Sequence, residues 1–365
     1  MIPLSIPELA GNEWKYIKEC LDTNWVSSAG SYVDMFEDKF IQYIGSKAAV
    51  VTVNGTAALH IALKVLDIQP GDEIIVPSMT FISPVNTIRY VGAEPVFVDV
   101  CRDTYVMDVN LVEELITPRT KAIIPVHIYG HPVDMDPLMD IAKKYGLYVI
   151  EDATESLGSL YKGRKTGTIG HIGCFSFNGN KIITTGAGGM LVSNEESIGA
   201  RAKYLSNQTK TLAENGAFIH EEVGYNYRMP NILAAMGVAQ LEAIDDKIAA
   251  KKKNAEYYTK LLSEVKGISL PVQKDWAFNV NWLYSILIED DYPIDRDQLI
   301  NLMKENGVEC RSFFYPVHMM TPYKNCKSSK MAVTMDITKR GINIPSSVDL
   351  SQENIEKICK LIKFL

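Results

Sequence analysis

The sequence predicts an α/β fold built on a mostly parallel sheet, and three observations support this prediction. The chain has 365 residues, 47% of them hydrophobic, so it can bury a large core as two domains or as one domain with an appendage. Over its first two-thirds, short β-branched runs alternate with helical stretches, which is typical of βαβ units. The strand-like runs are continuously apolar, as expected when helices cover both faces of a sheet.

The predicted elements follow this alternation along the chain. Seven strands are predicted in the first two-thirds, at residues 48–53, 73–76, 95–98, 121–125, 147–151, 174–177 and 189–193. Helices are predicted between them, at residues 56–66, 83–90, 110–116 and 136–144. Pro230 then precedes one long predicted helix over residues 231–262, because proline suits the first turn of a helix.

A smaller α+β region is predicted after Gly267. Its elements are a strand, a helix, a short strand and a final amphipathic helix, at residues 282–288, 296–306, 308–311 and 352–365. We place the domain boundary near Asp245, inside the long helix. This divides the chain into a large domain (1–245) and a small C-terminal domain (246–365).

Composition argues against several classes of protein. The net charge is −7 and no basic block stands out, which argues against a nucleic-acid-binding surface; the lysines at 251–253 are expected to form a solvated helix face. The six cysteines are scattered, which favours reduced thiols over a disulfide framework or a metal site. No signal peptide is recognised and no apolar run reaches the ~18 residues of a membrane span, so the expected location is the cytoplasm.

Lys181 is the most informative residue, because it follows a short apolar strand and precedes a Thr/Gly-rich turn. Taken alone, it could be a surface lysine on a loop. Burial would lower its pKa and expose the lone pair needed for a Schiff base. Pyridoxal phosphate supplies the aldehyde for such a bond and needs an acid at its pyridine nitrogen. Asp152, at the end of another apolar strand, could be that acid or could cap the next helix.

Gly55 and Thr56 follow the first predicted strand and begin a helix. A helix N-terminus presents free N–H groups and a partial positive charge, so this is a phosphate site in form. Gly-Thr is also a common strand-to-helix turn, and the spacing matches neither a P-loop nor a dinucleotide loop. Phe81, at the exit of a strand, could stack on a flat ring or pack in the core.

Two later segments combine polar and aromatic residues. Residues 224–229 include Asn226 and Arg228 and suit contacts with anions and rings, or ordinary helix capping. Residues 311–318 include a cation, aromatic side chains and an imidazole, and they could line a pocket for a sugar nucleotide. His318 could equally be an ordinary loop histidine.

Together these segments resemble the DegT/DnrJ/EryC1/StrS family of sugar aminotransferases. The resemblance covers essentially the whole chain and rests on seven motifs that stand in the family's order. They lie at residues 24–28, 54–60, 126–130, 151–153, 175–190, 224–229 and 341–346.

The resemblance implies the fold of the aspartate aminotransferases (fold type I of the enzymes that use pyridoxal 5′-phosphate) and a homodimer with active sites at the subunit interface. It implies that Lys181 is the Schiff-base lysine, that Asp152 pairs with the pyridine nitrogen and that Glu155 lies beside the cofactor. The other implied cofactor contacts are Gly55, Thr56 and Ser176 to the phosphate, Phe81 to the ring, and Asn226 to the phosphate in the partner's site. The candidate substrate-binding residues are Trp25, Arg228, Arg311, Tyr315 and His318.

Dehydratases of the family carry histidine in place of this lysine, so the chain resembles a true aminotransferase. The implied reaction moves an amino group from L-glutamate to a nucleotide-linked 4-keto-6-deoxy sugar for a surface polysaccharide such as O-antigen or capsule. A dehydratase or a non-enzymatic regulator on the same fold are the alternatives.

The nucleotide stays open, because two signals conflict. Residues 314–318 look like perosamine synthases, which use GDP-4-keto-6-deoxymannose. Ala187, where many members have glutamate, and residues 178–180 look closer to the branch that acts on UDP-linked 4-keto sugars on the way to legionaminic acid or bacillosamine.

Overall fold

A seven-stranded sheet lies at the centre of the computed structural model, which describes residues 1–363. Its strands, in spatial order, are β1 (Ala48–Thr52), β9 (Gly189–Ser193), β8 (Ile172–Ser176), β5 (Tyr148–Asp152), β4 (Thr120–Ile123), β2 (Glu73–Pro77) and β3 (Glu94–Val98). β9 runs antiparallel to both of its neighbours, and every other neighbouring pair is parallel. The mostly parallel sheet and its seven predicted strands are therefore confirmed.

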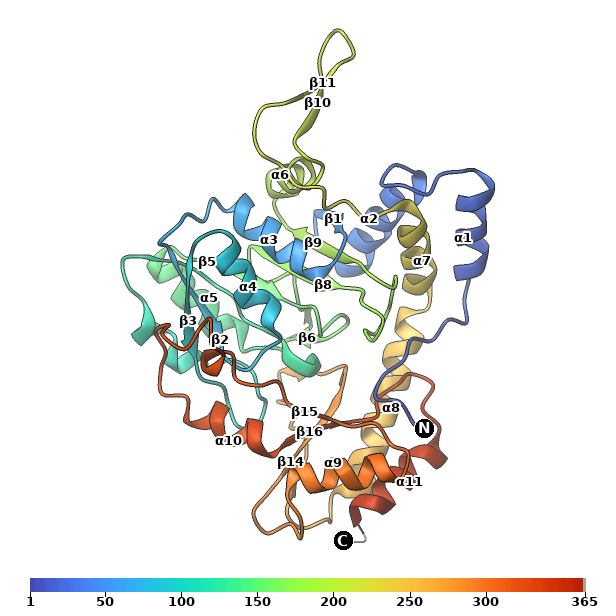
Figure 1. Cartoon of the computed structure of the whole chain (residues 1–365), viewed down its shortest axis with the longest axis vertical. Helices are drawn as coiled ribbons and strands as arrows, with labels where there is room; N and C mark the ends of the chain where they lie inside the picture. Colours follow the sequence, from blue (N-terminus) through green and yellow to red (C-terminus); the bar gives the residue numbers. More distant parts are fainter. Residues whose placement is uncertain (364–365) are drawn as a thin grey trace.

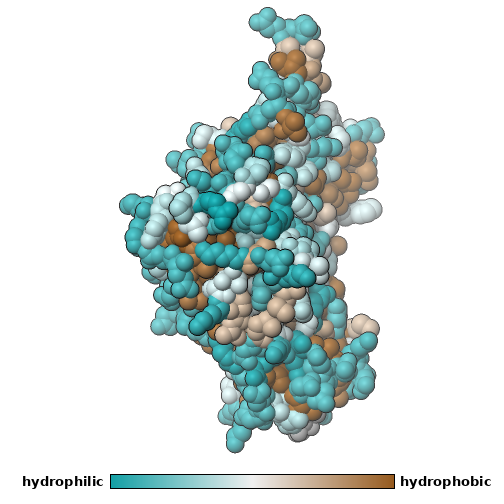
Figure 2. Space-filling model, turned by 60° about the vertical axis from the view of Figure 1, so that its left-hand side comes forward, coloured by the Kyte–Doolittle hydropathy of each residue, from teal (hydrophilic) through white to brown (hydrophobic). Residues whose placement is uncertain are grey.

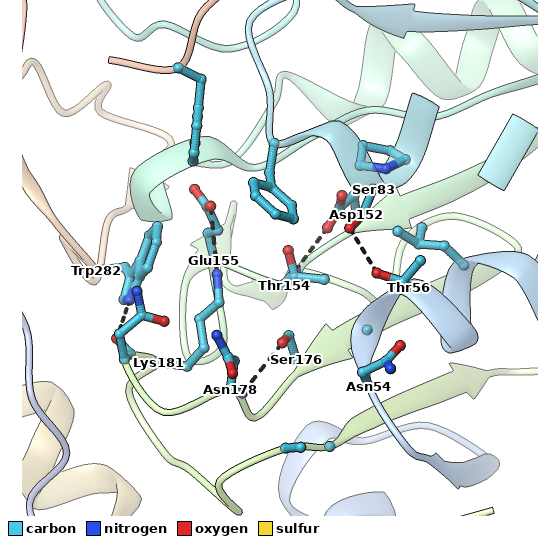
Figure 3. A pocket seen from close by; sticks show the side chains of 18 of the residues that line it. Asn54, Thr56, Ser83, Asp152, Thr154, Glu155, Ser176, Asn178, Lys181 and Trp282 are labelled. Carbon is cyan, nitrogen blue, oxygen red and sulfur yellow. Dashed lines mark hydrogen bonds and ion pairs between the residues drawn. The ribbon is translucent and has the colours of Figure 1, made fainter. Parts of the chain in front are cut away.

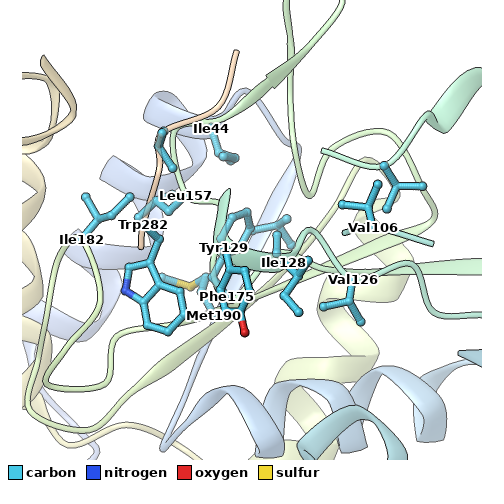
Figure 4. Close-up of a cluster of buried hydrophobic side chains, with 14 of the residues drawn as sticks. Ile44, Val106, Val126, Ile128, Tyr129, Leu157, Phe175, Ile182, Met190 and Trp282 are labelled. Carbon is cyan, nitrogen blue, oxygen red and sulfur yellow. The ribbon is translucent and has the colours of Figure 1, made fainter. Parts of the chain in front are cut away.

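Helices cover both faces of this sheet (Figure 1). One face packs against α3 (Gly55–Val65), α4 (Ile82–Tyr90) and α6 (Glu196–Ser206). The other face packs against α2 (Ser31–Ile44), α5 (Met135–Tyr145) and α7 (Asn231–Glu242). Successive strand residues point to opposite faces, so Ile74 and Ile75 enter different cores. Both faces need apolar residues, which explains the continuous apolar runs in the sequence. Figure 4 shows part of the second core.

The C-terminal region forms a second, antiparallel sheet with its own core (Figure 1, bottom). Its strand order is β12 (Ile268–Ser269), β14 (Tyr284–Ile288), β16 (Gly341–Ile344) and β15 (Arg311–Ser312). Its helices are α8 (Ile244–Leu262), α9 (Arg296–Glu305) and α11 (Gln352–Lys363). Ile2 packs in the same core. The boundary near Asp245 stays a prediction.

Several predicted elements differ from the structure. The long helix 231–262 is interrupted at Ala243, whose φ of −108° and ψ of 12° are not helical. The helix predicted at 110–116 is two 3₁₀ turns, Val109–Leu111 and Glu113–Leu115, because Pro118 disfavours helical geometry at Thr117. The short strand predicted at 308–311 is the two-residue β15. Four helices and one strand of the small domain's sheet were not predicted: α1 (Glu13–Asp22), α2, α6, α10 (Ala332–Arg340) and β16. The last two residues of the predicted final helix lie outside the described residues.

A β-hairpin projects from the body beyond α6 (Figure 1, top). Its strands are β10 (Lys210–Leu212) and β11 (Phe218–His220), and the side chains of Leu212, Phe218 and Ile219 are exposed on it. Figure 2 shows these apolar side chains as brown patches on the projection. Within residues 1–363, no helix combines the length and the apolar character needed to cross a bilayer.

Lys251 on α8 is buried, contrary to the expectation of a solvated face at 251–253. Its Nζ donates to the carbonyl oxygen of Trp282 at 2.8 Å and to that of Ser346. Burial lowers the pKa of Lys251 from 10.5 to about 7. In contrast, Lys253 on the same helix is exposed, as predicted.

This burial should make folding stability depend on pH. Between about pH 7 and 10.5 the unfolded chain binds a proton at Lys251 that the folded chain does not, so stability rises with pH. We expect the difference in unfolding free energy between wild type and Lys251→Met to grow by up to about 1.4 kcal/mol per pH unit across this window. Urea unfolding at several pH values measures this difference. Lys253→Met is the matched control and should show no such slope; an equal slope in both variants would contradict the assignment.

Candidate active site

A cavity opens where the parallel strands end, at the carboxyl edge of the central sheet (Figure 3). Asp152 ends β5, Ser176 ends β8, and Gly55 lies just beyond β1. This edge is where open α/β sheets bind ligands. The lining residues are Asn54, Gly55, Thr56, Leu59, Phe81, Ser83, Pro84, Asp152, Thr154, Glu155, Ser176, Asn178, Asn180, Lys181, Ala187, Gly188, Trp282, Arg311 and Phe314.

Lys181 projects into this cavity from the turn that follows β8. Its backbone N–H donates to the carbonyl oxygen of Asn178 at 3.0 Å, which closes the turn. Its Nζ lies 3.6 Å from Glu155 Oε1 and 3.8 Å from the centroid of the Trp282 ring. Burial lowers the pKa of Lys181, and the charges of Glu155 and Asp152 oppose this shift. The lysine is thus a buried amine of the kind that can act as a nucleophile.

Two buried carboxylates face the same cavity. Asp152 accepts a hydrogen bond from the backbone N–H of Thr154 at 3.1 Å, and Glu155 accepts one from the N–H of Tyr129 at 2.9 Å. Burial raises the pKa of Asp152 and of Glu155, while the charge of Lys181 acts against the shift at each. Tyr129 has a φ of +54°, a conformation that is strained for a non-glycine residue. Its N–H thereby reaches Glu155, which holds this carboxylate close to the lysine.

A third carboxylate, Glu151, lies behind the cavity and is fully buried. His127 accepts from the N–H of Val133 through Nδ1 at 3.0 Å, so its Nε2 donates to Glu151 at 2.9 Å. Three backbone N–H groups of the 167–170 loop also donate to Glu151, at 2.6 to 2.8 Å. These bonds satisfy Glu151 and fix the end of β5, from which Asp152 projects.

The N-terminus of α3 forms another wall. The Asn54 side chain caps the helix by accepting from the N–H of Ala57 at 2.8 Å. The N–H groups in the first turn have no acceptor within the helix, so they are available to an anion. A Cβ atom at Gly55 would lie 3.0 Å from Ser176 Cβ and 3.1 Å from Thr154 Cγ2, so glycine allows this close approach. Thr56 Oγ1 lies 2.7 Å from Ser83 Oγ.

The structure brings eight of the predicted site residues together around the cavity: Gly55, Thr56, Phe81, Asp152, Glu155, Ser176, Lys181 and Arg311. Trp25, Tyr315 and Asn226 are exposed and do not line it. His318 lies outside it as well, with its Nδ1 2.6 Å from Ser78 Oγ.

Arg228 has a different place from the one the sequence suggested. It is buried away from the cavity, and its guanidinium donates to Glu37 Oε1 at 2.6 Å. Glu37 also accepts from the backbone N–H of Val51 at 3.0 Å. We therefore assign Arg228 a structural ion pair in place of substrate binding.

Removing this guanidinium should destabilise the fold. Arg228→Ala leaves the buried Glu37 carboxylate without its closest cation, so we expect a loss of about 3 kcal/mol in the free energy of unfolding. Urea unfolding measures this loss. Lys203→Ala is a matched control, because Lys203 reaches the same carboxylate at 3.0 Å from an exposed position and should cost about 1 kcal/mol or less. Equal losses in the two variants would count against the buried pair.

Several residues of the cavity were not predicted from the sequence. Trp282 is the most prominent, because its ring lies against Lys181. It follows Asn281, which has a φ of +49° and whose N–H donates to the side chain of Asn279 at 2.7 Å. This asparagine turn before a strand was a visible signal, although nothing in it indicated which cavity the tryptophan would face.

The residues present fit pyridoxal 5′-phosphate. This cofactor needs an amine for its covalent bond, an acid at its ring nitrogen, a flat contact for the ring and a site for its phosphate. Lys181, Asp152 and Phe81 line one cavity with the N-terminus of α3, beside which Gly55 leaves no room for a Cβ atom. The cavity therefore contains each type of group that the cofactor requires.

Comparison with known proteins agrees with this geometry. The model of the DegT/DnrJ/EryC1/StrS aminotransferase family matches residues 7–363. The chain is 44% identical over 361 residues to a GDP-perosamine synthase of Escherichia coli O157:H7, covering 99% of this chain and 97% of the relative. It is 41% identical over 366 residues to a GDP-perosamine synthase of Vibrio cholerae, covering 100% and 98%.

A solved structure agrees with the fold. The PLP form of the putative sugar aminotransferase Spr1654 from Streptococcus pneumoniae superposes with a TM-score of 0.93 at 26% identity, covering 99% of this chain and 97% of that one. The sugar aminotransferases among its relatives favour a transaminase over the dehydratase and regulator alternatives. The chain is a pyridoxal-phosphate-dependent sugar aminotransferase and belongs to the DegT/DnrJ/EryC1/StrS aminotransferase family.

Proposed function

We propose that the enzyme transfers the amino group of L-glutamate to the C4 ketone of a GDP-linked 4-keto-6-deoxy sugar. The product would be a 4-amino sugar for a surface polysaccharide such as O-antigen or capsule. Two observations support this proposal. The cavity holds a buried lysine between two carboxylates, and both full-length relatives described above are named for GDP-perosamine synthesis. The second observation favours GDP over UDP, which the sequence motifs left open.

The roles proposed for the cavity residues follow from their surroundings. When bound, pyridoxal phosphate supplies a carbonyl carbon for the amine and a ring that accepts electrons. Lys181 would attach the cofactor and, once its amine is free, would carry a proton, because its lowered pKa favours proton exchange. Asp152 would hold the proton at the ring nitrogen. Gly55, Thr56 and Ser176 would bind the phosphate, and Phe81 would stack on the ring.

The outer part of the site would bind the nucleotide sugar. Arg311 lines the cavity, its side chain is 57% exposed, and its ion pair with Glu309 is long at 3.6 Å. It is therefore available to a diphosphate or a carboxylate. Tyr315 and Trp25 are exposed aromatic side chains that could contact a base or sugar. His318 stays a candidate at the end of the same segment.

A homodimer with shared active sites is part of this proposal. The apolar side chains on the β10–β11 hairpin are exposed, and so is Phe81 at the cavity. A second copy of the chain would cover such surface, and exposed Asn226 could then reach the partner's phosphate site. Light scattering of the purified chain tests the dimer. The cytoplasmic location stays a prediction.

A panel of acceptors tests the substrate. Purified enzyme loaded with cofactor is incubated with glutamate and with GDP-, dTDP- or UDP-linked 4-keto-6-deoxy sugars, and the products are identified by mass spectrometry. The expected result is an amino sugar from GDP-4-keto-6-deoxymannose, at a kcat/KM at least about tenfold above the other nucleotides, which corresponds to about 1.4 kcal/mol of discrimination. Preferential amination of a UDP-linked sugar would replace the GDP assignment, and no amino product from any of them would refute the acceptor class.

A further inference from the structure

Trp282 contacts Lys181 in two ways. The face of its indole ring lies under the Lys181 Nζ, 3.8 Å from atom to ring centroid. Its Nε1–H donates at 2.7 Å to the carbonyl oxygen of Asn180, the residue before Lys181. Figure 3 shows the ring beside the lysine, whose amine points toward Glu155. One side chain thus contacts both the amine of Lys181 and the backbone from which the lysine projects.

The position of Trp282 is itself fixed from behind. The Trp282 side chain is buried, and its carbonyl oxygen accepts from Lys251 Nζ at 2.8 Å. Its ring stacks on Tyr129, with centroids 6.4 Å apart and planes 27° apart (Figure 4). Tyr129 in turn donates its N–H to Glu155. Trp282 and Glu155, the two groups that contact the Lys181 amine, are therefore linked to each other through Tyr129.

Such a link matters because the lysine must have two positions during a reaction cycle. It holds the cofactor covalently in one part of the cycle and has a free amine in the other. A free lysine side chain has about 2 kcal/mol of rotamer entropy, so it would sample many positions without a directing contact. An aromatic face attracts an ammonium group, and the attraction grows when water is excluded.

We propose that Trp282 is a positioning residue for Lys181. Its ring face, together with Glu155, holds the lysine amine whenever that amine is free. Its indole N–H fixes the turn at Asn180, so the amine returns to the same place in each cycle. This inference rests on the catalytic role of Lys181 and not on the identity of the sugar.

The first test measures the pKa of Lys181 directly. The full-length chain, purified without added cofactor, is labelled with acetic anhydride across a pH series, and the Lys181 peptide is quantified by mass spectrometry. Trp282→Leu removes the aromatic face that favours the charged amine, so the pKa of Lys181 should fall by about 0.5 to 1.5 pH units. Trp282→Phe keeps a face, so that pKa should stay within about 0.3 units of wild type. Trp276→Leu, at a tryptophan outside the cavity, is the matched control and should leave the pKa unchanged.

A second measurement avoids any change of shape. Fluorinated tryptophans weaken the attraction of the ring for a cation while keeping its size. Incorporation of mono-, di- and trifluorotryptophan should lower the pKa of Lys181 stepwise in the wild-type chain but not in Trp282→Phe, which retains the other three tryptophans. This result is accessible even if Trp282→Leu fails to fold.

Kinetics with glutamate alone complete the test. In the loaded enzyme, Trp282→Phe lacks the bond to Asn180 and should lower the rate of the glutamate half-reaction about tenfold, with the KM for glutamate unchanged. A Lys181 pKa that follows neither fluorination nor Trp282→Leu would overturn the proposal. So would a Trp282→Phe enzyme with the wild-type half-reaction rate. Failure of the nucleotide-sugar panel would leave both readouts intact, since neither uses the sugar.

Discussion

Lys181→Ala should abolish amino transfer, with a loss of at least about 10³-fold in turnover. Lys181 is the only buried amine among the residues that line the cavity, and its Nζ lies beside Glu155. Alanine can neither attach the cofactor nor carry a proton, so covalent and acid–base catalysis are lost together. The measurement is the rate of 2-oxoglutarate formation from glutamate and an acceptor sugar. Borohydride reduction followed by peptide mapping should also place the cofactor on Lys181 in wild type.

Two controls make this result specific. Lys253→Ala removes an exposed lysine and should keep full activity. The circular dichroism spectrum of Lys181→Ala should match that of wild type, because the lysine has no structural bond except a long ion pair at 3.6 Å. More than a tenth of wild-type turnover in Lys181→Ala would show that another group performs the chemistry.

Asp152→Asn should give the second largest effect, a loss of about 10²- to 10⁴-fold in kcat. Asparagine keeps the size of the side chain and its acceptor for the Thr154 N–H, but it carries no charge to hold a proton on the cofactor ring. Cofactor binding should persist, because Lys181 and the N-terminus of α3 are unchanged. Absorbance of bound cofactor and kcat, measured on the same preparation, separate the two effects.

Asp140→Asn, at an exposed position on α5, is the matched control and should leave kcat unchanged. If Asp152→Asn kept wild-type kcat, the carboxylate would have no role in the chemistry. If it lost the cofactor altogether, its main contribution would be to binding.

The sequence predicted the centre of the site because local patterns carry it. Lys181, Asp152 and Gly55 each stand at the end of an apolar strand, and a parallel sheet brings such ends to one edge. The same reasoning could not find Trp282, since it approaches the edge from the small domain's sheet. Its contact with Lys181 depends on packing across about a hundred residues of sequence, which no periodicity reports.

Burial of charged residues was the other feature that the sequence could not show. Arg228 and Glu37 are 191 positions apart, and only the packing of α2 against β1 and the segment before α7 brings them together. Lys251 stands in a row of three lysines that resembles a solvated face, yet one helix turn separates its buried position from an exposed one. A single substitution of Glu37 or of Trp282 would change these environments without altering the local pattern.

The absorption spectrum of the cofactor-loaded enzyme on addition of L-glutamate alone tests the central claim most directly. The account predicts that the visible band of the lysine-bound cofactor disappears, that absorbance near the ultraviolet grows, and that about one equivalent of 2-oxoglutarate forms per active site. Addition of excess 2-oxoglutarate should restore the original spectrum. An unchanged spectrum with no 2-oxoglutarate formed would contradict the assignment of this Lys181-centred cavity as a transaminase site that uses glutamate.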